Sequence, residues 1–172
     1  MNEIWSMGFM HDRLADKRSY RLLNIADIFS RECVATEVAQ FFRSEDVVRV
    51  LKNACRERGL PKAIRCDNET AFVATPVDRW AYANRVQLDF SRPGTPTDHA
   101  FIESSNGGVR LEFLNSSYFE TLDEARRAAR ILRIAYNEFR THSMLANKTS
   151  NEYARSVESN PMCRFYTVRN GP

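Results

Sequence analysis

The stretch NEIWSMGFMHD, residues 2–12, predicts a buried β-strand with a glycine in its interior. Side chains alternate between the two faces of a strand. One face carries Trp5, Met7 and Phe9, and the other carries Ile4, Ser6, Gly8 and Met10. Glycine is unfavourable inside a strand, because it packs no side chain and loses the most backbone entropy on folding. Gly8 therefore needs an explanation other than packing.

The segments that follow predict an α/β fold. Two further strands at residues 20–29 and 30–39 follow short polar connections, which favour an antiparallel meander. A helix is predicted from Ser44, as N-cap, to Gly59. The remaining predicted elements are a strand at 61–66, a helix at 75–85, a strand at 86–90 and helices at about 99–115 and 121–140. This order predicts a five-stranded mixed sheet, three antiparallel strands then two parallel ones, flanked by helices.

The bulk composition bounds the class of protein. A chain of 172 residues with 43% hydrophobic residues is long enough for one sizeable core. No apolar run approaches the ~20 residues that span a bilayer, and the N-terminus lacks a signal-peptide pattern. A cytoplasmic protein is the simplest interpretation. Cysteines at 33, 55, 66 and 163 form no CxxC pair, which argues against a zinc site or a disulfide framework.

The charge supports a nucleic-acid partner only weakly. The formal net charge is +3 and the pI is about 8.8, and all but four of the 25 basic residues are arginines. Arginine binds phosphate oxygens in a bidentate way. Coding bias explains the same richness equally well. Arginines also surround the last predicted helix, at positions 126, 127, 130 and 133. They are candidates for contacts with a DNA backbone, but a solvated helix face is the favoured interpretation.

Two carboxylates stand out by position. Asp67 follows the fourth predicted strand, and strand ends of such sheets are where sites are built. Glu103 lies near the start of the next predicted helix, and 35 residues separate the two. Such a pair suits Mg²⁺, which prefers one or two carboxylates with water and phosphate. The alternative interpretation is that Asp67 is a turn residue and that Glu103 only complements a helix dipole.

Five stretches of the chain carry a family resemblance. They are EIWSMGF (3–9), LLNIADIFSREC (22–33), GLPKAIRCDN (59–68), DRWAYANRVQLDFSRPGTPTDHAFIESSNG (78–107) and YNEFRTHSMLANKTSNEYA (136–154). Together they resemble the integrase-type catalytic core of bacterial insertion-sequence transposases. The resemblance covers about residues 3–154 and implies an RNase H-like fold. It implies a core domain over residues 1–155 and a C-terminal tail over 156–172.

The resemblance also implies a catalytic Asp, Asp, Glu triad with 35 residues between the last two members. Asp67 matches the second Asp and Glu103 matches the Glu, so both are expected to hold Mg²⁺ or Mn²⁺ in a two-metal site. The family carries its first Asp in a Trp-Ser-Met-Asp-Phe string. Here Gly8 stands in place of that Asp, so metal binding and catalysis are expected to be impaired. Asn106 and Arg110, on the Glu103 helix, are expected to place DNA, together with Arg126 and Arg130.

Other departures from the family pattern resemble drift rather than a new chemistry. Ser105 stands where the family has Phe, and Gly107 and Gly108 are adjacent in a predicted helix. Asp12, Asp27 and Glu69 are the acids considered as substitutes for the missing one. None is expected to succeed, because a misplacement of about 1 Å can cost 10²-fold in rate.

Two functions follow from the resemblance. The first is a transposase core whose partners are transposon ends and target DNA. It would cleave DNA and transfer strands with reduced activity. The second is an inactive remnant that binds DNA non-specifically, or that forms a homodimer or a hetero-oligomer with an intact transposase and interferes with it. The sequence starts within the core and the family's upstream helix-turn-helix region is not expected in it, so specific binding to transposon ends is not expected from this chain alone.

Overall fold

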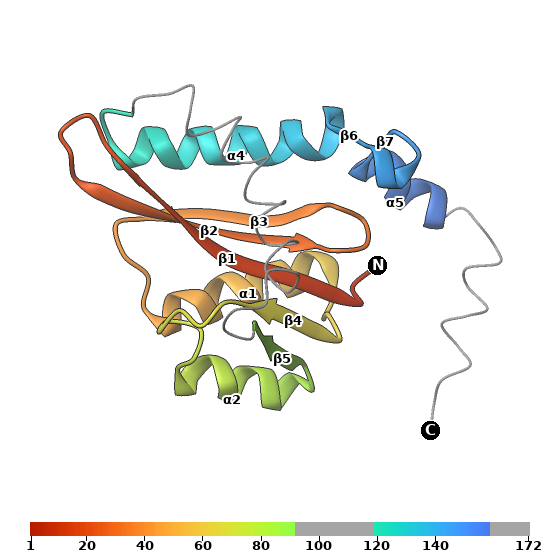
Figure 1. Cartoon of the computed structure of the whole chain (residues 1–172), viewed down its shortest axis with the longest axis horizontal. Coiled ribbons are helices and arrows are strands. Elements are labelled where there is room, and N and C mark those ends of the chain that lie inside the picture. The colour runs from red at the N-terminus through yellow and green to blue at the C-terminus, as the bar shows by residue number, and fades with distance from the viewer. Residues whose placement is uncertain (92–118, 159–172) are drawn as a thin grey trace.

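The structure is a computed structural model that describes residues 1–91 and 119–158. The main sheet contains β1 (Ile4–Arg13), β2 (Ser19–Asp27), β3 (Cys33–Ala39), β4 (Ala63–Cys66) and β5 (Gln87–Phe90). The α-helices of the described part are α1 (Ser44–Arg58), α2 (Thr75–Asn84), α4 (Leu122–Phe139) and α5 (Ser150–Glu158). Figure 1 shows the strands side by side, with α4 running along β3.

The sheet has the order β3-β2-β1-β4-β5. The first three strands pair antiparallel as a meander, while β4 pairs parallel with β1 and β5 pairs parallel with β4. This is the predicted mixed sheet. The parallel pairing of β1 with β4 brings Met7 opposite Cys66, near the end of β4.

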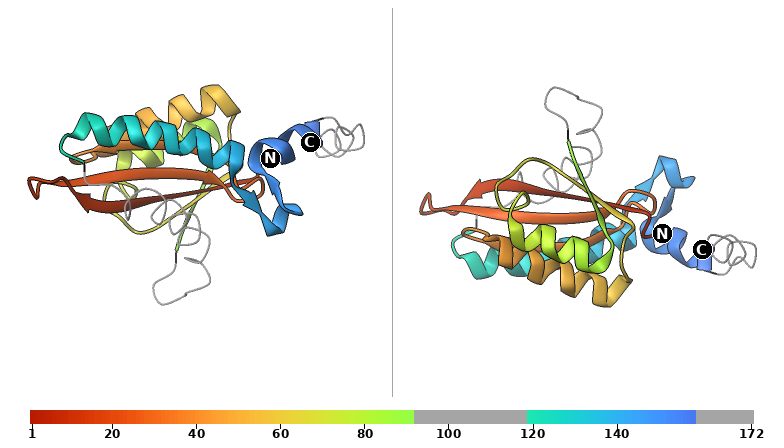
Figure 2. Two further views of the ribbon diagram at one scale, coloured as in Figure 1. Left: turned by 90° about the horizontal axis from the view of Figure 1, so that it is seen from above. Right: turned by 90° about the horizontal axis from the view of Figure 1, so that it is seen from below.

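The main core lies on one face of the sheet, under α1 and α2. Trp5, Met7 and Phe9 of β1 belong to one cluster with the buried stripe of α1 and with Val77 and Trp80 of α2. Figure 2 shows both helices on the same side of the sheet. Because strand side chains alternate, Ser6, Gly8 and Met10 point to the opposite face. A second cluster contains Met10, Leu22 and Val38, together with Ala125 and Ala129 of α4, which runs along the β3 edge of the sheet (Figure 1).

Local sequence signals explain where most elements begin and end. Gly59 ends α1 with a φ of 85°, in a region that favours glycine, and its N–H donates to Cys55 O. The N-cap prediction is wrong by one residue. Arg43 is the N-cap of α1, and its N–H donates to the Asp46 carboxylate at 3.1 Å. The Thr121 hydroxyl accepts from the N–H of Glu124 and begins α4.

The segment after α4 has structure that the sequence did not predict. A two-residue strand, β6 (Thr141–His142), is followed by a 3₁₀ turn, η2 (Ser143–Leu145), and by β7 (Lys148–Thr149), which pairs with β6. Helix α5 then extends past residue 155, the predicted end of the core. The predicted helix at 99–115 lies outside the described residues. Within residues 1–91 and 119–158, no helix is both long and apolar enough to cross a membrane.

Candidate functional site

The candidate site is built where β1 passes the end of β4. The parallel register ends with Met7 opposite Cys66, and the residues that follow are Gly8 on β1 and Asp67 just after the end of β4. Adjacent strands are about 4.8 Å apart. Gly8 is buried and pairs with Asn24 on its other side. The β1 residue that follows the last β1–β4 pair is therefore one that has no side chain.

Asp67 is held at the start of a well-bonded loop. One carboxylate oxygen, Oδ1, accepts from the N–H of Glu69 at 3.3 Å. The next residue, Asn68, donates from its side chain to Ser91 O at 2.9 Å. Ser91 in turn donates from both its N–H and its hydroxyl to Cys66 O. These bonds fix the backbone on both sides of the Asp67 carboxylate, which is half-buried.

The thiol beside Asp67 stays protonated. Cys66 is fully buried, and burial, with the negative charges of Asp67 and Asp89, raises its pKa to about 12. A protonated thiol is a poor metal ligand. Cys66 therefore contributes packing to this end of the sheet rather than a ligand.

The described residues do not supply ligands for a pair of metal ions. Within residues 1–91 and 119–158, no three His, Cys, Asp or Glu side chains come close enough to hold a metal ion together. Asp67 is the carboxylate at this end of β4, and Gly8 adds nothing to it. Glu103, Asn106 and Arg110 lie outside the described residues, so their part in the site stays a prediction.

Two of the possible substitute acids are engaged elsewhere. Asp12 lies four residues beyond Gly8 on β1, which is about 13 Å along the strand, and it accepts from the Tyr20 hydroxyl at 3.1 Å. Asp27 lies opposite Trp5 and is 2% exposed. Its carboxylate accepts three backbone N–H groups, those of residues 2, 29 and 30. Asp27 thus closes the turn after β2 and holds the N-terminus.

The third acid, Glu69, is only two residues from Asp67 in sequence, but its carboxylate is directed towards Arg21. Its carboxylate lies 3.5 Å from the Arg21 guanidinium. That guanidinium lies over the Phe9 ring, 5.3 Å from the centroid, and Phe9 belongs to the core under α1 and α2. Gly8 faces the other side of the sheet. The ion pair therefore draws the Glu69 carboxylate towards the opposite face from the one where a ligand is missing.

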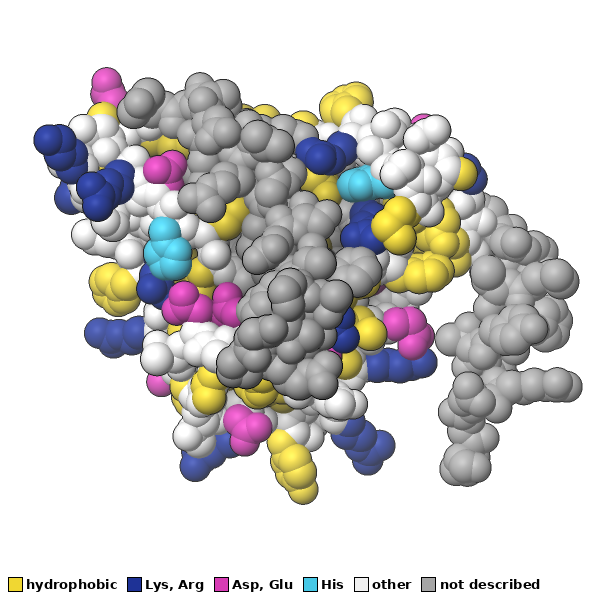
Figure 3. Space-filling model, viewed as in Figure 1, with side chains coloured by type: hydrophobic (Ala, Val, Ile, Leu, Met, Phe, Trp, Pro, Cys, Tyr) yellow, Lys and Arg dark blue, Asp and Glu magenta, His cyan; other side chains and the backbone are white. Residues whose placement is uncertain are grey.

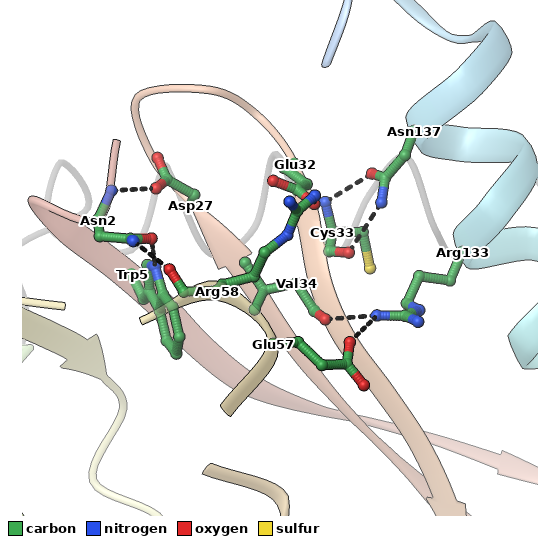
Figure 4. Close-up of polar contacts among 10 residues, drawn as sticks. All are labelled: Asn2, Trp5, Asp27, Glu32, Cys33, Val34, Glu57, Arg58, Arg133 and Asn137. Atoms are coloured by element: carbon green, nitrogen blue, oxygen red, sulfur yellow. Dashed lines mark hydrogen bonds and ion pairs between the residues drawn. The ribbon is translucent and has the colours of Figure 1, made fainter. Parts of the chain in front are cut away.

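The predicted arginines of α4 lie along β3, at the far edge of the sheet from β4. Arg126 donates from Nε to Val38 O at 3.0 Å and from Nη1 to Asp123 at 2.9 Å. Arg133 donates to Val34 O at 2.7 Å and lies 3.7 Å from the Glu57 carboxylate of α1 (Figure 4). Both side chains thus hold α4 against β3. A role of Arg126 in DNA binding stays a prediction, as does that of Arg130, which is exposed.

Asn137 completes this contact and was missed by the sequence analysis. It is 8% exposed, accepts from Cys33 N at 2.8 Å and donates to Cys33 O at 3.0 Å (Figure 4). The amide thus satisfies both backbone groups of one β3 residue. The only sequence signal was an asparagine on the apolar side of an amphipathic helix, which does not identify its partner.

A cavity of about 250 Å³, which we call the arginine pocket, opens on the same side of the sheet as Gly8. Its basic lining residues are Arg31, Arg140 and His142, and its floor includes Ser6 and Ala26, which pair across β1 and β2. Figure 3 shows Lys or Arg side chains beside a histidine near the end of α4. No role was predicted for these residues from the sequence, although the stretch YNEFRTHS (136–143) contains Arg140 and His142.

Comparisons with known families agree with this architecture. One integrase core domain model matches residues 1–96, and a second integrase core domain model matches residues 84–149. The two matches together cover β1 to β7. They include the Gly8 and Asp67 positions as well as the segment that lines the arginine pocket.

Several insertion-element proteins are related to the chain. A 31.7 kDa protein of insertion element IS407 from Burkholderia multivorans is 41% identical over 153 residues, which are 89% of this chain and 55% of the relative. A 39.2 kDa protein of IS476 from Xanthomonas euvesicatoria is 38% identical, over 83% of this chain and 41% of the relative. The transposase of IS904 from Lactococcus lactis is 26% identical, over 90% and 62%. The chain spans about half the length of these relatives.

Solved structures confirm the fold. The integrase catalytic core domain of HTLV-2, solved in complex with magnesium, superposes with a TM-score of 0.65 at 20% identity, over 88% of this chain and 95% of that one. The catalytic core of BIV integrase gives 0.67 at 14% identity, over 92% and 98%. A chain of the simian T-cell lymphotropic virus intasome gives 0.77 at 20% identity, over 93% and 56%. The described sheet is thus the RNase H-like sheet of integrase cores.

Proposed function

The chain belongs to the integrase core domain family, and we propose that it is the catalytic core of an insertion-sequence transposase whose DNA cleavage and strand transfer are impaired by Gly8. One observation supports the proposal: the β1–β4 register ends with Met7 opposite Cys66, and the next residue on β1 is Gly8, which has no carboxylate, while the next after β4 is Asp67. The insertion-element relatives support the substrate, which we propose to be the DNA of transposon ends and targets.

We propose Mg²⁺ or Mn²⁺ as the cofactor, with Asp67 and Glu103 as its protein ligands. The related HTLV-2 core was solved in complex with magnesium, which supports a divalent ion. A bound ion of this kind would activate a water or a 3′-hydroxyl and stabilise the leaving oxygen of a phosphodiester. The Asp67 carboxylate suits one such ion, held with water and phosphate. Gly8 provides no ligand shared between two ions, so the described donor set does not fit a metal pair.

A nicking and strand-transfer assay with Mg²⁺ or Mn²⁺ tests this proposal. We expect no activity above background from this chain and a gain of at least about 10-fold from Gly8→Asp, because one ligand is worth several kcal/mol of charge stabilisation. Gly8→Asn is the matched control, since it has the size of aspartate without its charge. Asp67→Ala or Glu103→Ala in the Gly8→Asp background should return the activity to background.

Three outcomes would contradict parts of the proposal. Activity of the unaltered chain that equals that of Gly8→Asp and that Asp67→Ala abolishes would show that Gly8 does not impair catalysis. Activity that survives both alanine substitutions would remove these two residues from the site. A folded but inactive Gly8→Asp chain would show that the defect extends beyond position 8.

The second candidate function is interference with an intact transposase. It is favoured by the packing around Gly8, since the described sheet and core form without a side chain at this position. As a homodimer or a hetero-oligomer the chain would then reduce the activity of its partner. Co-expression with an active relative should lower transposition frequency, and an unchanged frequency would exclude this role.

A further inference from the structure

We infer that the arginine pocket binds a phosphate group of a DNA strand that passes the Gly8–Asp67 end of the sheet. The phosphate site stands on the pocket residues alone, while the assignment of the strand as DNA rests on the proposed function. The pocket is distinct from the Asp67 position and contains no residue of the expected triad.

The position of the pocket favours a ligand that continues towards Asp67. Its floor residue Ser6 lies two positions before Gly8 on β1, on the same face of the sheet, which is about 7 Å along the strand. Successive phosphates of an extended strand have a comparable spacing, so neighbouring phosphates can occupy the pocket and the candidate site together. A phosphate held here would fix the register of a strand without reading its sequence.

The charge of the pocket favours an anion. Two guanidinium groups, those of Arg31 and Arg140, line it together with the His142 imidazole. Among the described residues that line the pocket, the acid is Asp27, and both of its carboxylate oxygens accept backbone N–H groups. Among the described lining residues, two guanidinium groups thus stand against one carboxylate, which favours an anionic ligand.

The guanidinium groups are oriented by their neighbours. Arg140 lies over the Tyr136 ring, 5.2 Å from its centroid, and that ring lies 5.5 Å from the His142 ring. Arg31 lies in the turn after β2 with a φ of 59°, a left-handed conformation that is unfavourable for residues with a side chain. Its Nη2 lies 2.7 Å from Met144 Sδ. Pre-oriented arginines bind phosphate with less loss of side-chain entropy.

The size of the pocket suits one phosphate group rather than a complete small molecule. About 250 Å³ is below the roughly 300–1,000 Å³ of typical ligand pockets. The hydroxyls of Thr141 and Ser143 supply polar lining groups that can bond phosphate oxygens, whereas the Ser6 hydroxyl already donates to Ala26 O at 3.3 Å. A phosphodiester with its bases outside the pocket satisfies both the size and the charge.

His142 provides a direct readout of phosphate binding. Burial, followed by the positive charges of Arg140 and Arg31, lowers the pKa of this imidazole. A phosphate between the arginines would oppose the effect and raise the His142 pKa. The imidazole signals of the folded chain can be followed by NMR in pH titrations, with His142→Gln to assign the resonance. The probes are inorganic phosphate and a short single-stranded DNA oligonucleotide, each compared with chloride at equal ionic strength.

Paired variants separate the pocket from general charge. Arg31→Gly removes a guanidinium from a backbone position that glycine adopts without strain. Arg85→Gly is its matched control, since Arg85 also has a left-handed φ, 56°, and is exposed at the end of α2. We expect Arg31→Gly to weaken oligonucleotide binding about five- to ten-fold and to reduce its salt dependence by about one phosphate contact, with less than about a two-fold effect of Arg85→Gly.

The outcomes decide the inference and separate it from the proposed function. It is supported if both probes raise the His142 pKa and Arg31→Gly weakens this response. A response to inorganic phosphate but not to the oligonucleotide would overturn the assignment to a DNA strand. No response, or equal effects of the Arg31 and Arg85 variants, would overturn the site itself. None of these measurements needs catalysis, so an inactive Gly8→Asp chain would leave the pocket result standing.

Discussion

The outer edge of β3 and the end of β4 use polar side chains in opposite ways. At β3, the side chains of Arg126, Arg133 and Asn137 from α4 bond to backbone groups of the strand. At the end of β4, the last β1–β4 pair is followed by Asp67 on one side and by a glycine, Gly8, on the other. One set of polar residues holds the fold together. At position 8 of β1, beside the end of β4, a polar side chain is absent and the strands still pair.

This difference teaches which substitutions the architecture itself resists. A buried backbone group without a partner costs about 1–3 kcal/mol, so removing a side chain from the β3 edge destabilises the fold. Removing a carboxylate from position 8 leaves no backbone group without its partner, because the ladder bonds of β1 come from the main chain. A triad position can therefore be lost without loss of the fold, whereas the α4–β3 contact cannot.

Loss of the Asn137 amide should have the largest effect. Asn137→Ala leaves both the N–H and the C=O of Cys33 without their partner, so we expect the free energy of unfolding to fall by about 2–4 kcal/mol. Urea denaturation measures the change. Glu138→Ala, an exposed neighbour on α4, is the control and should change stability by less than about 0.5 kcal/mol. Equal losses in both variants would show that the amide does not hold the edge of β3.

Adding a carboxylate at position 8 should also lower the stability of the fold, but here a bound metal ion should restore it. We expect Gly8→Asp to destabilise the chain by about 1–2 kcal/mol without divalent ions, because its charge lies near that of Asp67. Thermal unfolding with and without Mg²⁺ should show a recovery for Gly8→Asp and none for Gly8→Asn. If Mg²⁺ stabilises both variants equally, position 8 does not contribute to a metal site.

The two regions also contain buried thiols that should make the fold sensitive to alkali. Burial raises the pKa of Cys33 from its ordinary value of 9.0 to about 11. Above pH 9 the unfolded chain therefore loses this proton while the folded chain keeps it. The stabilisation is complete below pH 9 and is lost as the pH rises towards 11. From pH 8 to pH 10 we expect a loss of about 1 kcal/mol from this thiol.

Denaturation at both pH values, repeated on Cys33→Ala, isolates the Cys33 contribution. The variant should lose correspondingly less stability over the same interval, because Cys66 and the other groups that titrate there remain. Identical pH dependence in the two proteins would contradict the role of this thiol.

The arginine contacts at β3 should have the smallest effect. Arg133→Gln removes the bond to Val34 O and the ion pair with Glu57, but the side chain is 34% exposed and water can replace part of both. We expect a loss of about 0.5–1 kcal/mol. Arg127→Gln, on an exposed position of the same helix, should cost less than half of this in the same denaturation experiment. A loss as large as that of Asn137→Ala would mean that the ion pair is effectively buried.

The sequence predicted most of the described fold, because the strands and long helices carry strong periodic patterns. The alternation of Trp5, Met7 and Phe9 and the stripe of α1 gave the correct buried faces. The elements between residues 141 and 158 were missed, since two-residue strands and a 3₁₀ turn have no period to detect. The Ser44 N-cap was wrong because the Asp46 carboxylate bonds one residue further back, at Arg43.

The sequence predicted only those parts of the candidate site where the family pattern requires one residue type at one position. The resemblance related Gly8 and Asp67 to one site, and in the structure the two residues directly follow the last β1–β4 pair, Met7 and Cys66. The arginine pocket could not be predicted, because Arg31 and Arg140 are far apart in sequence and meet only through the packing of α4 and β6 against the turn after β2. The favoured interpretation of a solvated α4 face also missed Arg126 and Arg133, whose partners are main-chain oxygens of a distant strand.

The position of α4 along β3 has a consequence for assembly. An exposed edge strand offers free main-chain donors and acceptors on which another chain can add a strand, and such edges are sites of aggregation. Here part of that edge is already bonded to side chains of α4. Strand addition at β3 would first have to displace the helix. Contacts of this sheet edge with a second chain are therefore directed to the outer surface of α4, where side chains rather than backbone ladders would determine the pairing.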